Sequence, residues 1–142
     1  MEEEVNKIEV SNLNITEALK EQIKYCNELS HYHCGIYLKR FKDKKLVFDE
    51  VVDLITNKDS IERMFNNSCS TEIRFKNGSF IRIICANQNA RGYKNHGAII
   101  DNEIETEIIN CIIMPTIIPR CFEDFKREPW EEAKKRVLYC DI

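Results

Sequence analysis

The segment from Glu72 to Ile83 constrains the fold most. Two short runs of alternating residues, Glu72–Phe75 and Phe80–Ile83, flank the sequence Lys76-Asn77-Gly78-Ser79. Asn-Gly between two such runs is typical of a β-hairpin, because both residues tolerate the left-handed backbone that a tight turn requires. The sequence therefore predicts two antiparallel strands here.

The register of this hairpin follows from the alternation of its side chains. A plain two-residue turn would pair Ile73 with Arg82 and mix the two faces. A three-residue loop with Gly78 left-handed instead pairs Ile73 with Ile81 and Glu72 with Arg82. We predict the second register, which buries four side chains together: Ile73, Phe75, Ile81 and Ile83.

The remaining elements come from apolar runs and helical spacing. Strands are predicted at residues 5–10, 34–38 and 97–101. Helices are predicted to begin at Ile15, after a capping box at Asn14-Ile15-Thr16-Glu17, and to span residues 43–56, 60–65, 103–113 and about 129–140. The last of these begins at Pro129, which suits a first helical position.

The order of these elements predicts the fold class α/β, a small open and mainly parallel sheet with flanking helices and a β-hairpin. A chain of 142 residues with 43% hydrophobic residues is enough for one core, so we expect a single domain over residues 1–142. Its 21 basic and 24 acidic residues give a net charge of -3. Any contact with DNA must therefore be local.

The start of the chain and its cysteines indicate a compartment. Met1-Glu2-Glu3-Glu4 has neither the basic nor the apolar region of a signal peptide, and no apolar run approaches the ~20 residues that span a bilayer. We expect a cytoplasmic protein without membrane contact. The seven cysteines form no CxxC pair, and we expect free, largely buried thiols. His31-Tyr32-His33-Cys34 provides only two good metal ligands, which favours a turn leading into a strand over a metal site.

Three motifs in the second half of the chain stand in a specific order. The run Glu72-Ile-Arg-Phe-Lys-Asn-Gly-Ser-Phe-Ile-Arg-Ile-Ile contains an F-x-N-G-S-x-I core, Asn87–Gly92 contains A-R-G, and His96–Asp101 is an apolar run that ends on a carboxylate. This order resembles the ATPase core of a phage terminase large subunit, strongly over residues 72–119 and more loosely over 5–120. The resemblance implies a truncated P-loop NTPase-like fold, with Asp101 at the Walker B position, and a phage or prophage protein related to DNA packaging.

Two departures from the family pattern concern hydrolysis. In the family a glycine-rich loop ending in Gly-Lys-Ser/Thr holds the phosphates, whereas here Ser11–Thr16 has neither glycine nor lysine. The glutamate that should follow the Walker B aspartate is Asn102, which cannot act as a base. We therefore expect binding without hydrolysis.

The resemblance implies a set of candidate site residues. Asp101 and Glu103 are candidates for catalysis, Asp101 also for a metal, and Thr16, Arg91 and Gly92 for nucleotide binding. Mg²⁺ and a nucleotide are the implied cofactors if activity is retained. Without any site, Asp101 would cap the next helix, and Arg91-Gly92 would form a tight turn.

Three functions follow as hypotheses. The first is a terminase-like protein that does not hydrolyse ATP and binds a phage or host protein, a nucleotide or a nucleic acid. The second is an active ATPase or packaging-enzyme fragment completed by another chain, and the third is a phage anti-defence protein that sequesters a host component. A nucleic acid would be bound through a cationic group beside the ring of Phe41: Lys39, Arg40, Lys42, Lys44 and Lys45. A solvated helix start is the alternative for this group.

Overall fold

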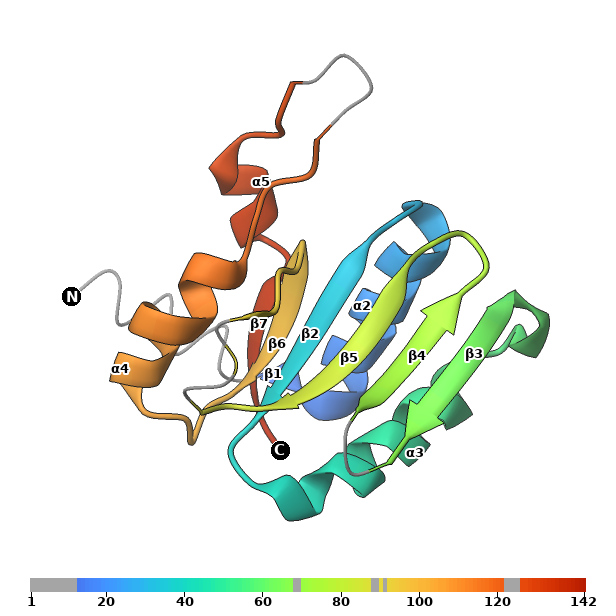
Figure 1. Ribbon diagram of the computed structural model, residues 1–142, viewed down its shortest axis with the longest axis horizontal. Helices are drawn as coiled ribbons and strands as arrows, with labels where there is room; N and C mark the ends of the chain where they lie inside the picture. Colours follow the sequence, from blue (N-terminus) through green and yellow to red (C-terminus); the bar gives the residue numbers. More distant parts are fainter. Residues whose placement is uncertain (1–12, 68–69, 88–89, 91, 122–125) are drawn as a thin grey trace.

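The chain folds around one seven-stranded sheet. The computed structural model describes residues 13–67, 70–87, 90, 92–121 and 126–142. Over these residues the strand order is β1-β7-β6-β2-β5-β4-β3 (Figure 1). The strands from β1 to β5 in this order are parallel, and β4 and β3 add to one side as antiparallel strands. The predicted α/β class with an open, mainly parallel sheet is confirmed, and the predicted strand at residues 5–10 lies outside the described residues.

The elements have the following bounds. The strands are β1 Leu13–Asn14, β2 His33–Leu38, β3 Ile61–Asn66, β4 Thr71–Phe75, β5 Phe80–Cys85, β6 Gly97–Asp101 and β7 Val137–Asp141. The helices are α2 Ile15–Glu28, α3 Lys44–Leu54, α4 Thr106–Ile108 and α5 Trp130–Lys134, with a π-helical turn η4 Ile109–Ile113. Short 3₁₀ turns are η1 Phe41–Asp43, η2 Lys58–Ser60 and η5 Met114–Thr116.

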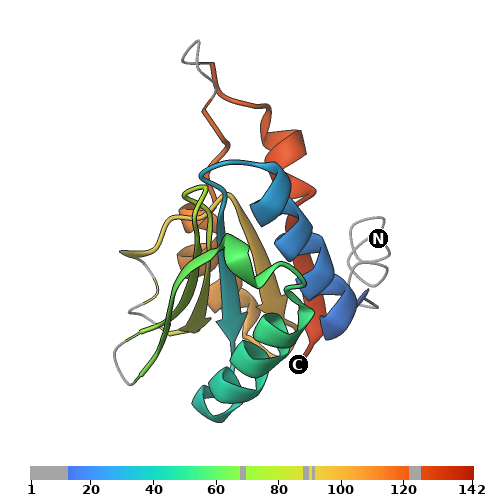
Figure 2. The same cartoon turned by 90° about the vertical axis from the view of Figure 1, so that its right-hand side faces the viewer.

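Helices cover the sheet unequally on its two faces. One face packs on α2 and α3 and forms a large core with side chains such as Leu19, Val51 and Ile81. Figure 2 shows both helices on the same side of the sheet. On the other face α4 and η4 cover the centre of the sheet, where Ile112 packs with Ile100. In the described part of the chain no helix lies over this second face of β3, β4 and the first half of β5 (Figure 1).

The hairpin has the predicted register. Ile73 pairs with Ile81 and Glu72 with Arg82. Gly78 has a φ of +86°, the left-handed conformation that the three-residue loop requires. The four side chains expected to share one face, Ile73, Phe75, Ile81 and Ile83, are all buried in the core beneath α2 and α3.

The start of the first helix is also as predicted. The Asn14 side chain accepts a hydrogen bond from the amide of Glu17 at 2.8 Å and caps α2. The second helix, α3, begins one residue after the predicted Asp43 and ends two residues before the predicted Thr56.

Three predicted helices are wrong in whole or in part. Residues 61–66 form β3, because the outer edge of β4 offers backbone partners that a short helix would leave unpaired. The predicted C-terminal helix at 129–140 ends at Lys134, and residues 137–141 form β7 between β1 and β6. Here burial between two strands overrides local helical pairing. The helix predicted at 103–113 begins only at Thr106 and becomes π-helical at Ile109.

Burial of the cysteines is mixed. Among the described cysteines, Cys26, Cys34 and Cys140 are buried as expected, Cys85 is half-buried, and Cys111 and Cys121 are exposed. The described residues include no helix with the length and apolar character needed to cross a membrane.

Candidate nucleic-acid interface

The uncovered face of β3, β4 and β5 carries arginine and aromatic side chains in register. Directly opposed residues share a face, so Phe65 lies beside Glu72 and Glu72 beside Arg82 in one row. In the next row Arg63 lies beside Arg74 and Arg74 beside Phe80. We call this surface, together with the loop residue Tyr93, the open face, defined by Arg63, Phe65, Glu72, Arg74, Phe80, Arg82 and Tyr93.

Two like charges are opposed on the open face. Arg63 and Arg74 are cross-strand partners and both are exposed. Like charges directly opposite in an antiparallel pair destabilise a sheet. Glu72 contacts Arg74, and Glu62 lies near Arg74 outside the defined face. The open face itself therefore has three arginines and one carboxylate. A bound anion would relieve the repulsion between Arg63 and Arg74.

Glu72 fixes the positions of two of the arginines. Its carboxylate is almost fully buried and accepts from the Nε of Arg74 at 2.6 Å and from the Nε of Arg82 at 3.0 Å. A buried carboxylate held by two guanidinium groups leaves the other N–H groups of each arginine for a ligand.

Four planar groups follow one another from the amino end of β2 to the loop before β6. The ring of His33 stacks on Phe80 with centroids 4.0 Å apart and an interplanar angle of 15°. The guanidinium of Arg82 lies over Phe80 at 4.5 Å and over Tyr93 at 4.9 Å. Aromatic rings and guanidinium planes of this kind are the groups on which unpaired nucleic-acid bases stack.

The predicted cationic group near Phe41 is divided by its salt bridges. Lys39 pairs with Glu105, the Nη2 of Arg40 lies 2.6 Å from Glu103, and Lys45 lies 2.9 Å from Asp49.

The other two cations of this group remain available. Among the described residues no carboxylate lies within salt-bridge distance of Lys42 or Lys44. The Lys44 ammonium lies 5.1 Å from the Phe41 ring, which is 66% exposed. Of the five cations, Lys42 and Lys44 are therefore the ones without an ion pair among the described residues.

A recess joins Lys44 to Tyr93 of the open face. It has a volume of about 270 Å³ and includes Phe41, Lys44 and Thr71 at one end and Tyr93 at the other. The recess thus links Lys44 with the end of β5 and with Tyr93.

Asp101, the central residue of the expected nucleotide site, is wholly buried at the end of β6. Its Oδ1 accepts from the amide of Glu103 at 3.0 Å and its Oδ2 from the amide of Lys39 at 3.3 Å. Because α4 begins only at Thr106, Asp101 closes a turn and joins β6 to β2. The prediction that Asp101 caps the following helix is therefore wrong.

The side chains of the other expected site residues that the structure describes do not contact Asp101. The hydroxyl of Thr16 donates to Glu50 of α3 at 2.5 Å, and Glu103 pairs with Arg40. Gly92 is exposed, with open space where a Cβ would stand, and Arg91 lies outside the described residues. The Asn102 amide donates to Asp141 at 3.1 Å.

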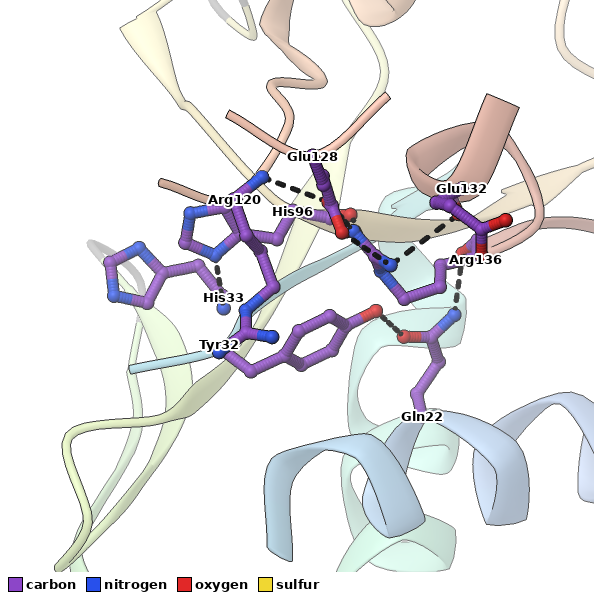
Figure 3. Close-up of polar contacts among 8 residues, drawn as sticks. All are labelled: Gln22, Tyr32, His33, His96, Arg120, Glu128, Glu132 and Arg136. Carbon is purple, nitrogen blue, oxygen red and sulfur yellow. Dashed lines mark hydrogen bonds and ion pairs between the residues drawn. The ribbon is translucent and has the colours of Figure 1, made fainter. Parts of the chain in front are cut away.

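A second polar cluster lies at the amino edge of the sheet (Figure 3). The buried Arg136 guanidinium pairs with Glu128, and its Nη1 donates to Glu128 Oε2 at 3.2 Å. The Gln22 amide donates to the carbonyl of Arg136 at 2.8 Å and accepts from the Tyr32 hydroxyl at 2.6 Å. These polar groups have partners within the chain, so the cluster ties α2 to the segment that leads into β7.

The two histidines beside this cluster have lowered pKa values. The amide of His33 donates to the Nδ1 of His96 at 3.0 Å, which requires an unprotonated Nδ1. Burial is the main reason why the pKa of His96 falls to about 4, with the His33 and Arg120 charges adding to it. Burial and the neighbouring Arg82 also lower the pKa of His33.

The described residues contain no group of three His, Cys, Asp or Glu side chains that could hold a metal ion. Comparison of the chain with models of protein families, with curated proteins and with solved structures gives no match.

Sequence analysis missed most of the open face. It identified Arg74 and Arg82 only as hairpin residues and assigned Arg63 and Phe65 to a helix. The signal that could have found the face is the alternation of Arg and aromatic residues on its solvent side, Arg63-x-Phe65 and Phe80-x-Arg82, next to strands whose other side is apolar.

Proposed function

We propose that this protein is a non-hydrolytic binding protein with a terminase-like ATPase-core architecture, and that it binds single-stranded nucleic acid across the open face. The observation that carries the proposal is the opposed pair Arg63 and Arg74 beside the stacked groups Phe80, Arg82 and Tyr93. Arginines contact phosphates without regard to sequence, and bases stack on the outer ring faces of this row, those of His33 and Tyr93.

A single strand fits this surface better than a duplex or a protein. Partly exposed rings on a sheet can stack only on bases that are unpaired. Arginine and aromatic side chains also occur at protein interfaces, where they accompany an apolar core. Large exposed apolar side chains among the described residues, such as Leu46 and Trp130, lie elsewhere.

The absence of hydrolysis is supported by the start of α2. The amide of Glu17, which would face a phosphate at a helix start, is bonded to Asn14, and the Thr16 hydroxyl is bonded to Glu50. Asp101 is buried with both oxygens bonded to amides. We expect no magnesium-dependent release of phosphate from ATP in a malachite-green assay. Release that Asp101→Ala abolishes would favour the alternative of an enzyme completed by another chain.

Fluorescence anisotropy with dT12, rU12 and a 12-base-pair duplex tests the binding. We expect saturable binding of the single strands and weaker binding of the duplex, with log affinity falling linearly as log salt rises. In the double variant Arg63→Gln, Arg74→Gln the slope should decrease in magnitude by about 1.4, since each phosphate contact on a single strand contributes about 0.7.

A matched control removes two charges from the covered side. Lys20→Gln, Lys24→Gln changes two exposed lysines of α2 and should leave the slope unchanged. Equal effects of the two double variants would mean that only net charge matters and would refute the open face as the interface. Failure of every oligonucleotide to bind would leave a protein partner, in packaging or in anti-defence, as the function to test.

A further inference from the structure

A second recess adjoins the one that reaches Tyr93. It has a volume of about 320 Å³ and shares Phe41, Lys44 and Thr71 with the first. We call it the lysine pocket, defined by its lining residues Phe41, Lys42, Lys44, Lys45, Asn66, Asn67 and Thr71. It lies where a strand crossing the open face along β5 would leave the sheet.

The lysine pocket surrounds the start of a helical segment. The 3₁₀ turn η1 runs directly into α3, an eleven-residue helix. Neither Arg40, which precedes η1, nor Asp43, which precedes α3, supplies a capping hydrogen bond from its side chain. Lysines at the positive end of a helix oppose the helix dipole, and a bound anion removes this conflict.

Thr71 is an independent indication that the pocket is a binding site. It is only 1% exposed, it lines both recesses, and its hydroxyl has no hydrogen-bond partner among the described residues. A buried hydroxyl without a partner is unfavourable by itself, and such groups in native structures call for an explanation. A ligand oxygen in the recess would accept its hydrogen bond.

The charge of the pocket matches a dianion. Lys45 is neutralised by Asp49, which leaves the ammonium groups of Lys42 and Lys44. An internal phosphodiester carries one negative charge, whereas a terminal phosphate carries between about 1.5 and 2 at neutral pH. Asp43 has a buried carboxylate oxygen without a partner, but it does not line the pocket.

From the free lysines, the uncapped helix start and the unpartnered Thr71 hydroxyl, we infer that the lysine pocket binds the terminal phosphate group of a nucleic-acid strand lying on the open face. This inference rests on the proposed function. On this inference the protein recognises the end of a nucleic-acid strand. The bases lie on β5 and on the loop before β6, and the end phosphate lies at the start of α3.

The test compares dT12 with a 5′-phosphate, with a 3′-phosphate and with neither, by fluorescence anisotropy on the full chain. One of the phosphorylated strands should bind about tenfold more tightly than the unphosphorylated one, as expected for charge-assisted hydrogen bonds to the added group. The other should bind like the unphosphorylated strand, and the preferred end gives the polarity of binding.

Variants assign this preference to the pocket. Lys42→Gln and Lys44→Gln should each reduce the preference to about twofold or less while dT12 without a phosphate still binds. Thr71→Val should reduce it severalfold and Thr71→Ser should retain it, because serine keeps the hydroxyl that valine lacks. Lys20→Gln on α2 should leave the preference unchanged.

Two outcomes separate this inference from the proposed function. Equal binding of all three strands would overturn the end-phosphate site and leave binding on the open face intact. If no strand binds, titration of the protein with inorganic phosphate, followed by amide NMR, decides whether the lysine pocket binds an anion. Saturable shifts confined to residues 41–46 and lost in Lys44→Gln would support an anion site alone, and no shift there would overturn it.

Discussion

The guanidinium of Arg82 contacts one carboxylate oxygen of Glu72 twice, through Nε at 3.0 Å and Nη2 at 2.8 Å. This contact holds the guanidinium plane between the rings of Phe80 and Tyr93. Both partners come from the hairpin, whose register places them opposite each other. The hairpin thus determines the geometry of the open face as well as the core beneath it.

Arg82→Lys should weaken binding of dT12 about tenfold although the charge is kept. A lysine ammonium cannot stack on Phe80 and Tyr93, and it cannot make both contacts with Glu72. Anisotropy at one fixed salt concentration measures the effect. Trp130→Leu is the control, since this exposed ring lies on α5, away from the open face. Unchanged binding by Arg82→Lys would show that stacking at this position contributes nothing.

Asp101→Ala should lower the free energy of unfolding by about 2–3 kcal/mol, since it leaves the amides of Lys39 and Glu103 without their charged acceptor. Urea denaturation measures the change. Glu103→Gln breaks only an exposed ion pair with Arg40 and should change the stability by less than about 1 kcal/mol. Similar small effects of both variants would contradict a structural role for Asp101.

His96 should make the protein less stable in acid. Its pKa is about 4 in the folded chain and ordinarily 6.5, so between these values the unfolded chain binds more protons. Stability is therefore complete above about pH 6.5 and declines as the pH falls toward 4, by at most about 1.4 kcal/mol per pH unit for this group. Urea denaturation at a series of pH values measures the slope.

His96→Asn separates this histidine from its neighbours. The asparagine oxygen can accept the hydrogen bond from the His33 amide, but it does not titrate. The variant should lose most of the slope between pH 6.5 and 4. A slope that persists in full would assign it to His33, whose pKa is also lowered.

Gly97→Ala should destabilise the fold by about 2 kcal/mol or more. A Cβ at Gly97 would overlap the Tyr32 hydroxyl, which donates to Gln22, and would disturb a buried hydrogen bond. Gly92→Ala is the matched control, because open space surrounds that position. Thermal melts of the two variants give the comparison, and equal melting temperatures would show that Tyr32 moves aside at little cost.

Local signals predicted the parts of the fold that depend on neighbours in sequence. The Asn77-Gly78 turn fixed the pairing of Ile73 with Ile81, and Asn14 caps α2 as its sequence context indicates. Residues 137–141 could not be assigned in this way, because β7 is stabilised by pairing with β1 and β6, which lie far away in the sequence.

The candidate site was harder to predict than the fold, for a physical reason. The sequence placed Asp101 at a strand end, but nothing in it showed that the amides of Lys39 and Glu103 would use both carboxylate oxygens. The open face depends on β3, which was assigned to a helix, and on the contact between Arg82 and Tyr93 across a loop. Such contacts appear only when the strands are placed side by side.

The position of β7 has a consequence for synthesis on the ribosome. β1 comes first among the described strands, yet its partner in the sheet is β7, so more than a hundred residues must be translated before the two can pair. Until then α2 lacks its contact with β7, and the backbone groups of β6 that pair with β7 are exposed. A nascent chain in this state would expose backbone groups that invite association with other chains, and fast release of residues 137–141 from the exit tunnel would shorten that interval.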